Sequence, residues 1–153
     1  MARDPIPTWC IAVGIVHDNA GRLLLIQEVD GSWFFPAGPM HRGETWSDTL
    51  QRVALEEAGV PVVPQGVYKL DHRPVKDGAR MRAFFVAQPL TDVTPKATID
   101  RHSMGARWFY LTELKELHLR SIEVLRIVVD LAKGAPVHSL EVLRTEGELV
   151  PVA

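Results

Sequence analysis

Adjacent glutamates, Glu56 and Glu57, are the residues of this chain with the clearest capacity for chemistry. Neighbours on a helix point roughly 100° apart, so both carboxylates reach one ion only when it lies over the flank between them. A hard divalent cation such as Mg²⁺ suits this pair, because it accepts one or two protein carboxylates and fills its other positions with water and phosphate oxygens. The pair therefore predicts a cation site that can hold a diphosphate.

Positions 52 and 53 decide how complete this site is. Arg52 lies four residues before Glu56 and can pair with it, or with Glu44 from the preceding loop. A carboxylate at position 53 would complete a three-acid cluster, because that position lies one helical turn before the glutamate pair. The chain has Val53 there, so the sequence predicts a metal site with one ligand missing.

A helix over residues 46–58 is needed to present these side chains. Thr45 and Asp48 have the spacing of a capping box at its start. Gly59 supplies the left-handed residue that commonly follows a helix, and Pro61 prevents continuation. The expected buried stripe recurs every four residues and consists of Leu50, Ala54 and Ala58. The alternative is an ordinary amphipathic helix whose charged face has no chemical role.

The segment from position 38 to position 60 resembles the Nudix box, the signature of the Nudix (MutT-like) hydrolases. The residues in register are Gly38, Glu44, Arg52, Glu56, Glu57 and Gly59, and Val53 is the departure. Residues 23–28 and 31–38 also look like the strand and entry turn of this family. The entry from Trp33 to Gly38 is similar to the branch that hydrolyses oxidised purine nucleoside diphosphates.

The resemblance implies a role for each matching residue. Those implied to hold or stabilise Mg²⁺ or Mn²⁺ are Glu44, Arg52, Glu56, Glu57 and the carbonyl of Ala37. Gly38 is implied to let the loop turn tightly, and Gly59 ends the helix. The implied reaction is attack of water on a nucleoside diphosphate linked to another group, helped by the cation. Val53 replaces a carboxylate that the family often uses as a ligand or base.

Further candidates lie outside the helix. Asp100 and His102 precede the last expected strand, where relatives often offer an acid, so either is a candidate general base. His102 is equally explained as a solvated loop histidine. His41 and Arg42 beside the entry loop are candidates for phosphate contact, or are exposed loop residues. Trp46 is a candidate for stacking on a base or contacting a partner subunit.

Length and composition favour one domain over residues 1–153. A net charge of −2 gives no electrostatic footprint for nucleic acid or an anionic membrane. No segment approaches the roughly 20 apolar residues that cross a bilayer, and the start lacks a signal-peptide core. Cys10 is the only cysteine, which excludes an internal disulfide and a cysteine-based zinc site. The expected compartment is the cytoplasm.

The apolar pattern predicts short strands and two helices. Strands are expected at residues 9–16, 22–28, 32–35, 66–72, 80–88 and 106–111, with hairpins joining the first two and the pair around residues 76–78. A second helix is expected over residues 117–133. This order fits an α+β fold, an α/β/α sandwich with a mixed β-sheet, which the resemblance also implies. Residues 135–153 are expected to be a C-terminal extension, in which 138–143 adds a strand or packs on a second subunit of a homodimer.

These observations leave several functional hypotheses. The favoured one is a divalent-cation-dependent hydrolase of a nucleotide or another small diphosphate. The alternative is a hydrolysis-deficient Nudix-fold domain that binds nucleotides or regulates, which Val53 and His102 favour. A third hypothesis is an interaction domain whose helix only mimics the box. The sequence does not name the nucleotide, because no readable code for base recognition lies in its loops.

Overall fold

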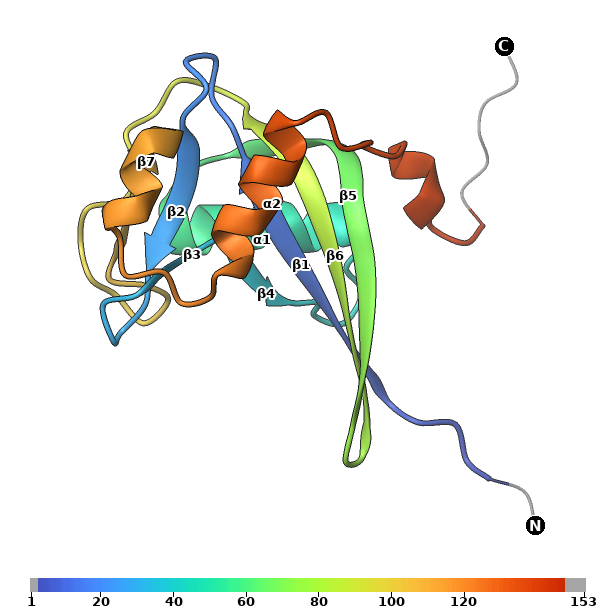
Figure 1. The fold of residues 1–153 in the computed structure, drawn as a ribbon. Helices are drawn as coiled ribbons and strands as arrows, with labels where there is room; N and C mark the ends of the chain where they lie inside the picture. Colours follow the sequence, from blue (N-terminus) through green and yellow to red (C-terminus); the bar gives the residue numbers. More distant parts are fainter. Residues whose placement is uncertain (1–2, 148–153) are drawn as a thin grey trace.

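The computed structural model describes residues 3–147, which form two β-sheets (Figure 1). The larger one, called the first sheet below, has the strand order β4 (Ala37–Pro39), β1 (Thr8–Val16), β6 (Gly78–Pro89) and β5 (Val62–Val75). The second sheet has the order β3 (Trp33–Phe34), β2 (Leu23–Gln27) and β7 (Gly105–Phe109). Strands β1 and β6 run parallel and the other pairs run antiparallel. The first sheet therefore contains parallel and antiparallel pairs, which confirms the predicted mixed β-sheet.

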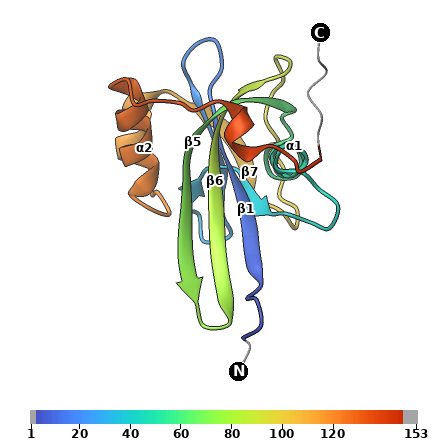
Figure 2. The same ribbon diagram turned by 90° about the vertical axis from the view of Figure 1, so that its right-hand side faces the viewer.

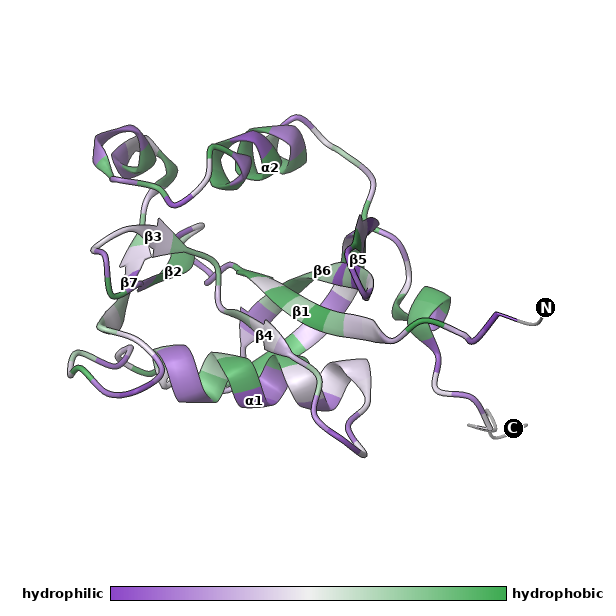
Figure 3. Ribbon diagram, turned by 90° about the horizontal axis from the view of Figure 1, so that it is seen from below, coloured by the Kyte–Doolittle hydropathy of each residue, from purple (hydrophilic) through white to green (hydrophobic). Residues whose placement is uncertain are grey.

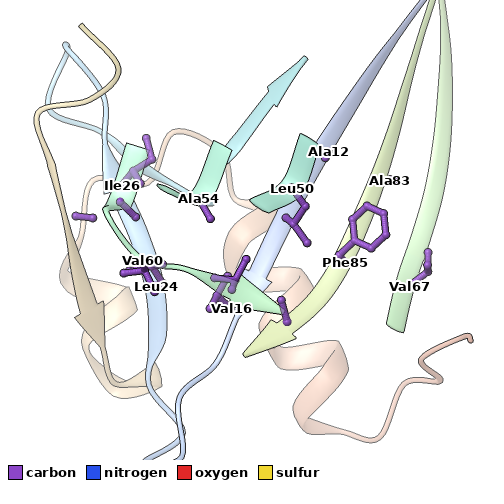
Figure 4. Packing of buried hydrophobic residues seen from close by; sticks show 14 residues of the cluster. Ala12, Val16, Leu24, Ile26, Leu50, Ala54, Val60, Val67, Ala83 and Phe85 are labelled. Atoms are coloured by element: carbon purple, nitrogen blue, oxygen red, sulfur yellow. The ribbon is translucent and has the colours of Figure 1, made fainter. Parts of the chain in front are cut away.

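Helices α1 (Trp46–Ala58) and α2 (Glu123–Ala132) lie on opposite sides of the sheets, as Figure 3 shows. The expected stripe of α1 is fully buried and packs on the first sheet, and Figure 4 shows this cluster with Leu50, Ala54, Ala12 and Phe85 among its labelled residues. The opposite face of the first sheet packs with α2 through Val13, Phe84, Val124, Ile127 and Val128. The α+β class and the α/β/α layers are confirmed.

The ends of α1 are fixed by the residues that the sequence indicated. Thr45 Oγ1 accepts a hydrogen bond from the Asp48 N–H at 3.1 Å, and Asp48 Oδ2 accepts one from the Thr45 N–H at 3.0 Å. At the other end Gly59 has φ 68°, the left-handed conformation that lets its N–H reach the last carbonyls of the helix. The helix therefore begins and ends where predicted, and the acidic pair lies in its last turn.

The predicted hairpin between the first two strands is wrong. Strands β1 and β2 belong to different sheets and share only the isolated bridge between His17 and Leu23. The two edges of β1 pair instead with β6 along its full length and with β4 at its centre, and the second half of the strand is buried on both faces. Strand β4 itself was not predicted, because the expected strand over residues 32–35 ends before Pro36 and no further strand was expected until residue 66.

The second helix is shorter at its start than the predicted range 117–133. Residues 111–116 form a 3₁₀ helix, η1 (Leu111–Glu116), and the chain then becomes extended at Leu117. The Trp33 N–H donates to the His118 carbonyl at 2.9 Å, and the Arg120 N–H donates to the Trp33 carbonyl at 2.9 Å. Residues 118–120 therefore pair with the edge of β3, and this pairing delays the start of α2 to Glu123.

The hairpin of β5 and β6 is confirmed, and its tip extends well beyond the helices (Figures 1 and 2). The C-terminal segment crosses back to β5, where His138 and Val67 form an isolated bridge. Residues 140–143 are the short 3₁₀ helix η2 (Leu140–Leu143), so the expected strand over 138–143 is wrong apart from that bridge. The last part of the predicted extension, residues 148–153, lies outside the described residues. Within residues 3–147, no helix has both the length and the apolar character needed to cross a membrane.

Candidate functional site

Arg52 joins the loop before α1 to the acidic end of that helix. Its Nε lies 2.7 Å from Glu44 Oε2, and its Nη2 lies 3.0 Å from Glu44 Oε1. Its Nη1 lies 3.2 Å from Glu56 Oε2, and Nη2 also donates to the Pro39 carbonyl at 2.6 Å. The sequence left open whether Arg52 pairs with Glu44 or with Glu56, and the guanidinium pairs with both. Its bidentate geometry holds the loop firmly on the helix.

Glu44 acts within this bracing network. Besides Arg52, it accepts a hydrogen bond from the His41 N–H at 2.7 Å and one from Thr49 Oγ1 at 3.2 Å. The hydrogen bonds from Arg52 are the main reason why the pKa of Glu44 falls to about 2. Glu44 is therefore ionised at any physiological pH. Both of its oxygens already have partners, so its expected place beside a cation is secondary to its place beside Arg52.

Glu57 has the most perturbed carboxyl of the site. Its Oε1 accepts a hydrogen bond from the Ala37 N–H at 2.8 Å, which fixes the end of α1 to the start of β4. Burial raises the pKa of Glu57 to about 8, and the nearby charges of Glu28 and Glu56 also raise it. This carboxyl is protonated at neutral pH when no cation is bound, and a cation would displace that proton.

Glu56 faces the loop that precedes β7. Its Oε2 lies 3.6 Å from Nδ1 of His102, so the structure brings this candidate base to the acidic pair. Lys96 Nζ donates to the Glu56 carbonyl at 2.8 Å, and Ser103 Oγ donates to the Glu57 carbonyl at 2.6 Å. These bonds satisfy carbonyls in the last turn of α1 and fix the 96–103 loop against it. Neither Lys96 nor Ser103 was predicted from the sequence to have such a role.

Asp100 has a structural task in the same loop. Its Oδ1 accepts hydrogen bonds from Lys96 Nζ at 2.8 Å and from the His102 N–H at 2.8 Å. The Lys96 bond is the main cause that lowers the pKa of Asp100 to about 2. A carboxylate with that pKa is a weak base at neutral pH. Of the two expected bases, His102 therefore fits the site better than Asp100.

Val53 occupies the position at which a carboxylate would complete a cluster of three acids. Its side chain is only 2% exposed and lies against Gly38 of β4. A Cβ added at Gly38 would come within 2.7 Å of Val53 Cγ2, so glycine is required for close approach of β4 to α1. The expectation that Gly38 allows a tight turn is corrected, because this residue lies inside a strand.

The donor set fits a hard divalent cation that shares its coordination with a ligand. Across the described part of the chain, no group of three or more His, Cys, Asp and Glu side chains is arranged to hold a metal by itself. Glu56, Glu57 and the Ala37 carbonyl are oxygen donors at the junction of β4 and α1. Mg²⁺ commonly binds through one or two carboxylates and completes its octahedron with water and phosphate. Such a set could hold a cation only together with a ligand that supplies further oxygen donors.

Three further residues were expected to touch the substrate. His41 and Arg42 are exposed in the loop between β4 and α1. Trp46 is half-buried and packs on Phe85, with ring centroids 6.3 Å apart, on the face of the first sheet that α1 covers. The structure therefore places Trp46 in the packing of α1.

A cavity of about 400 Å³ lies on the opposite face of the first sheet, next to Ala37. Ile11, Val13 and Phe34 give it apolar walls, and its charged lining consists of Arg80, Arg82, Arg120 and Glu123. The sequence analysis missed these arginines. The alternation of Arg80, Arg82 and Phe84 along β6 was a usable signal, since alternate residues of a strand share one face.

Arg120 connects this cavity to the acidic pair. Its Nη1 lies 2.9 Å from Glu28 Oε1, and Glu28 is a carboxylate whose charge raises the pKa of Glu57. Its guanidinium also lies over the ring of Phe34, 4.9 Å from the centroid. Two residues that line the cavity therefore also bond carboxylates outside it, Ala37 with Glu57 and Arg120 with Glu28.

Comparisons with known proteins agree with this geometry. The chain is 31% identical over 123 residues to the human (Homo sapiens) 8-oxo-dGDP phosphatase NUDT18, covering 77% of this chain and 37% of that protein. It is 30% identical over 127 residues to the Caenorhabditis elegans putative nudix hydrolase 1, covering 77% of this chain and 34% of that protein. The chain thus spans little more than a third of the length of these relatives.

Solved structures show the same fold. A NUDIX hydrolase from Nitrosomonas europaea matches with a TM-score of 0.74 at 21% identity, over 95% of this chain and 100% of that one. A C. elegans Ap4A hydrolase in a binary complex matches with a TM-score of 0.64 at 15% identity, over 82% of this chain and 96% of that one.

The NUDIX domain family model matches residues 9–127. This range contains both sheets almost completely, the acidic pair with its braces, and every residue that lines the cavity. The chain belongs to the Nudix family.

Proposed function

We propose that this chain hydrolyses a phosphoanhydride bond in a nucleoside di- or triphosphate, or in a nucleoside diphosphate derivative, with Mg²⁺ or Mn²⁺. The observation that carries the proposal is the position of Glu57, a half-buried carboxyl tied to the Ala37 N–H at 2.8 Å and adjacent to Glu56. Burial makes the uncompensated charge costly, and a divalent cation offsets that cost. Membership of the Nudix family and the named activity of the NUDT18 relatives support the same reaction.

Each residue of the site has a distinct part in this reaction. Glu56, Glu57 and the Ala37 carbonyl hold the cation, which when bound polarises a phosphoryl oxygen and lowers the pKa of water. Arg52 keeps the loop and helix in one geometry through Glu44 and Glu56. Most of the rate comes from such positioning and charge neutralisation, because phosphoryl transfer needs little covalent chemistry from the protein.

His102 is the proposed proton acceptor of the attacking water. Its Nδ1 faces Glu56 Oε2 at 3.6 Å, so the carboxylate can orient the ring, and its Nε2, which accepts a hydrogen bond from Arg101 Nε at 3.3 Å, is the nitrogen that would take the proton in place of that contact. Asp100 supports it by binding the His102 N–H. In this arrangement a histidine from the loop before β7 takes over a part that a carboxylate at position 53 would otherwise serve.

The cavity next to Ala37 is the proposed site for the nucleoside. Its apolar wall of Ile11, Val13 and Phe34 suits a base or sugar, and its volume of about 400 Å³ lies in the range of small-molecule sites. A ligand whose nucleoside lies there would have its diphosphate at the junction of β4 and α1. The human relative is named as an 8-oxo-dGDP phosphatase, which makes oxidised guanine nucleotides the first candidates to test.

A domain that binds nucleotides without hydrolysing them is the second candidate. The observation in its favour is Val53, an apolar side chain only 2% exposed at the position where a carboxylate would complete the acidic cluster. Both candidates require the cavity for nucleotide binding. They differ in whether the bound nucleotide is hydrolysed.

A substrate panel separates the two candidates. The protein is incubated with 8-oxo-dGDP, dGDP, Ap4A and common nucleoside diphosphate derivatives, in Mg²⁺, in Mn²⁺ or in EDTA, and products are separated by anion-exchange chromatography. Products that form only with the cation support the hydrolase. If none forms and calorimetry still detects nucleotide binding, the hydrolase proposal is overturned in favour of the binding domain.

A further inference from the structure

Arg80 differs from the other arginines of the cavity because it has no acceptor. Its Nε is buried, and no hydrogen-bond partner for it exists among the described residues. Arg82, by contrast, forms a bidentate pair with Asp71 at 3.0 and 2.8 Å. Arg120 binds Glu28 at 2.9 Å. A buried donor without a partner is costly, so Arg80 has hydrogen-bonding capacity that the rest of the chain does not use.

The surroundings of Arg80 raise that cost further. In the register of the β5–β6 hairpin, Arg80 lies opposite Arg73, and like charges that face each other across strands repel. On its other side Arg80 pairs with Trp9 of β1, which carries no charge. An anion bound at Arg80 would satisfy the buried donor and also offset the repulsion between the two guanidinium groups.

Arg80 is too far along the sheet to serve the cation site. Val13 lies between Ala37 and Phe84 in the strand register, and Arg80 lies four residues before Phe84 on β6. At roughly 3.3 Å per residue, this places Arg80 about 13 Å along the strands from the row of Ala37. Its guanidinium therefore faces the part of a ligand that lies away from the diphosphate.

We propose that Arg80 determines specificity by binding an anionic group, a carboxylate or a phosphate, carried on the part of the substrate remote from the scissile diphosphate. This inference rests on the proposed function, because it assumes that the diphosphate lies at the junction of β4 and α1. An oxyanion suits the site better than a neutral acceptor, since a guanidinium forms its strongest bonds with charged planar or tetrahedral oxygen groups. The substrate class is then a nucleoside diphosphate derivative with an additional negative charge.

Matched ligand pairs test this assignment. UDP-glucuronate and UDP-glucose differ in a terminal carboxylate, and ADP with or without a 2′-phosphate differs in a phosphate on the sugar. Binding of all four compounds is measured by calorimetry in EDTA and in Ca²⁺, on the full chain. We expect the parent to prefer the charged member of at least one pair about tenfold, as expected for a hydrogen bond to a charged group. The pair that discriminates identifies the group as carboxylate or phosphate.

Variants assign the preference to Arg80. Arg80→Met should reduce the preference to within about twofold, and Arg80→Gln serves if the methionine variant does not fold. The control is Arg126→Met, which removes the same charge from an exposed residue of α2 that lines a different cavity. The control should retain the preference of the parent, because its charge lies outside the cavity of Arg80.

Each outcome decides the inference. It is overturned if the parent discriminates in neither pair, if Arg80→Met retains the preference, if Arg126→Met loses it equally, or if millimolar ligand fails to bind. Should the substrate panel show hydrolysis while neither pair discriminates, the specificity role fails and the proposed function stands. Should the charged compounds bind through Arg80 while nothing is hydrolysed, the hydrolase proposal fails and the anion site stands.

Discussion

Replacing Glu57 by Gln should separate two properties of this carboxyl, the effect of its burial on folding stability and its contribution to cation binding. Burial raises the pKa of Glu57 to about 8, so in EDTA at neutral pH the residue is an uncharged acid. Glutamine has nearly the same shape and keeps an oxygen for the Ala37 N–H, which donates to Glu57 at 2.8 Å. The metal-free variant should therefore match the stability of the parent only below the pKa of an unfolded glutamate, about 4.3, and should be more stable than the parent at neutral pH, where the unfolded parent is ionised.

The size of the pH effect follows from this raised pKa. A carboxyl whose folded pKa lies above its unfolded value stabilises the protein fully below the unfolded pKa, and that contribution is lost as pH rises through the folded pKa. With a folded pKa of about 8, the parent should lose about 1.4 kcal/mol between pH 7 and pH 9 relative to Glu57→Gln. The same deprotonation should tighten the apparent binding of Mn²⁺ by the parent about tenfold over that range.

Urea unfolding in EDTA at pH 7, 8 and 9 measures the first effect, and calorimetric titration with Mn²⁺ measures the second. The parent and Glu57→Gln should diverge in stability as pH rises, and only the parent should show pH-dependent metal binding. If both proteins have the same pH profile of stability, Glu57 does not titrate as a buried acid. If the variant binds Mn²⁺ as tightly as the parent, Glu57 is not a ligand.

Three further substitutions test the frame of the site. Arg52→Lys should lower turnover strongly and the melting temperature only slightly, because lysine keeps the charge but lacks the forked guanidinium that joins Glu44 and Glu56. Turnover equal to that of the parent would refute the bracing role. Val53→Glu should destabilise the protein in EDTA by about 2 kcal/mol or more, since the residue is 2% exposed, and Mn²⁺ should restore part of the melting temperature if the new carboxylate reaches the cation. Gly38→Ala should cost about 1–3 kcal/mol of unfolding free energy, because its Cβ would meet Val53 Cγ2 at 2.7 Å. Adding Val53→Ala should relieve that clash, and strict additivity in urea unfolding would contradict the contact.

Local signals predicted α1 and the acidic pair well. The capping residues Thr45 and Asp48, the left-handed Gly59 and the spacing of the buried stripe all act within a few residues of each other. Interactions of this range can be recognised from sequence because the spacing of a helix fixes which side chains meet.

Strand pairing was predicted less well because it depends on partners far away in the chain. Strand β1 pairs with β6, some seventy residues later, instead of with its neighbour β2. The start of α2 depends on the pairing of His118 and Arg120 with Trp33. No local pattern carries this information, since it arises only when β3 meets the segment before the helix.

The cavity needed the same long-range information. Arg80 and Arg82 share a face of β6, which the sequence indicates, but their place in the same cavity as Ala37 depends on the register of three strands. Whether each arginine has a carboxylate partner also depends on the fold. Arg82 lies opposite Asp71 in the register of the hairpin, whereas Arg80 lies opposite Arg73. Sequence reasoning therefore located the acidic pair and missed the cavity that we propose binds the nucleoside.

Turnover against cation concentration tests the central claim most directly. Hydrolysis of the best substrate from the panel is measured for the parent, for Glu57→Gln and for the charge-matched control Glu141→Gln, an exposed residue of η2, while Mg²⁺ or Mn²⁺ is titrated from zero. We predict that the parent and the control saturate with the cation and that both are inactive in EDTA. Glu57→Gln should have little activity at any cation concentration. Equal activity of the parent in EDTA and in Mg²⁺, or full activity of Glu57→Gln at limiting cation, would contradict a cation-dependent hydrolase built on this pair of glutamates.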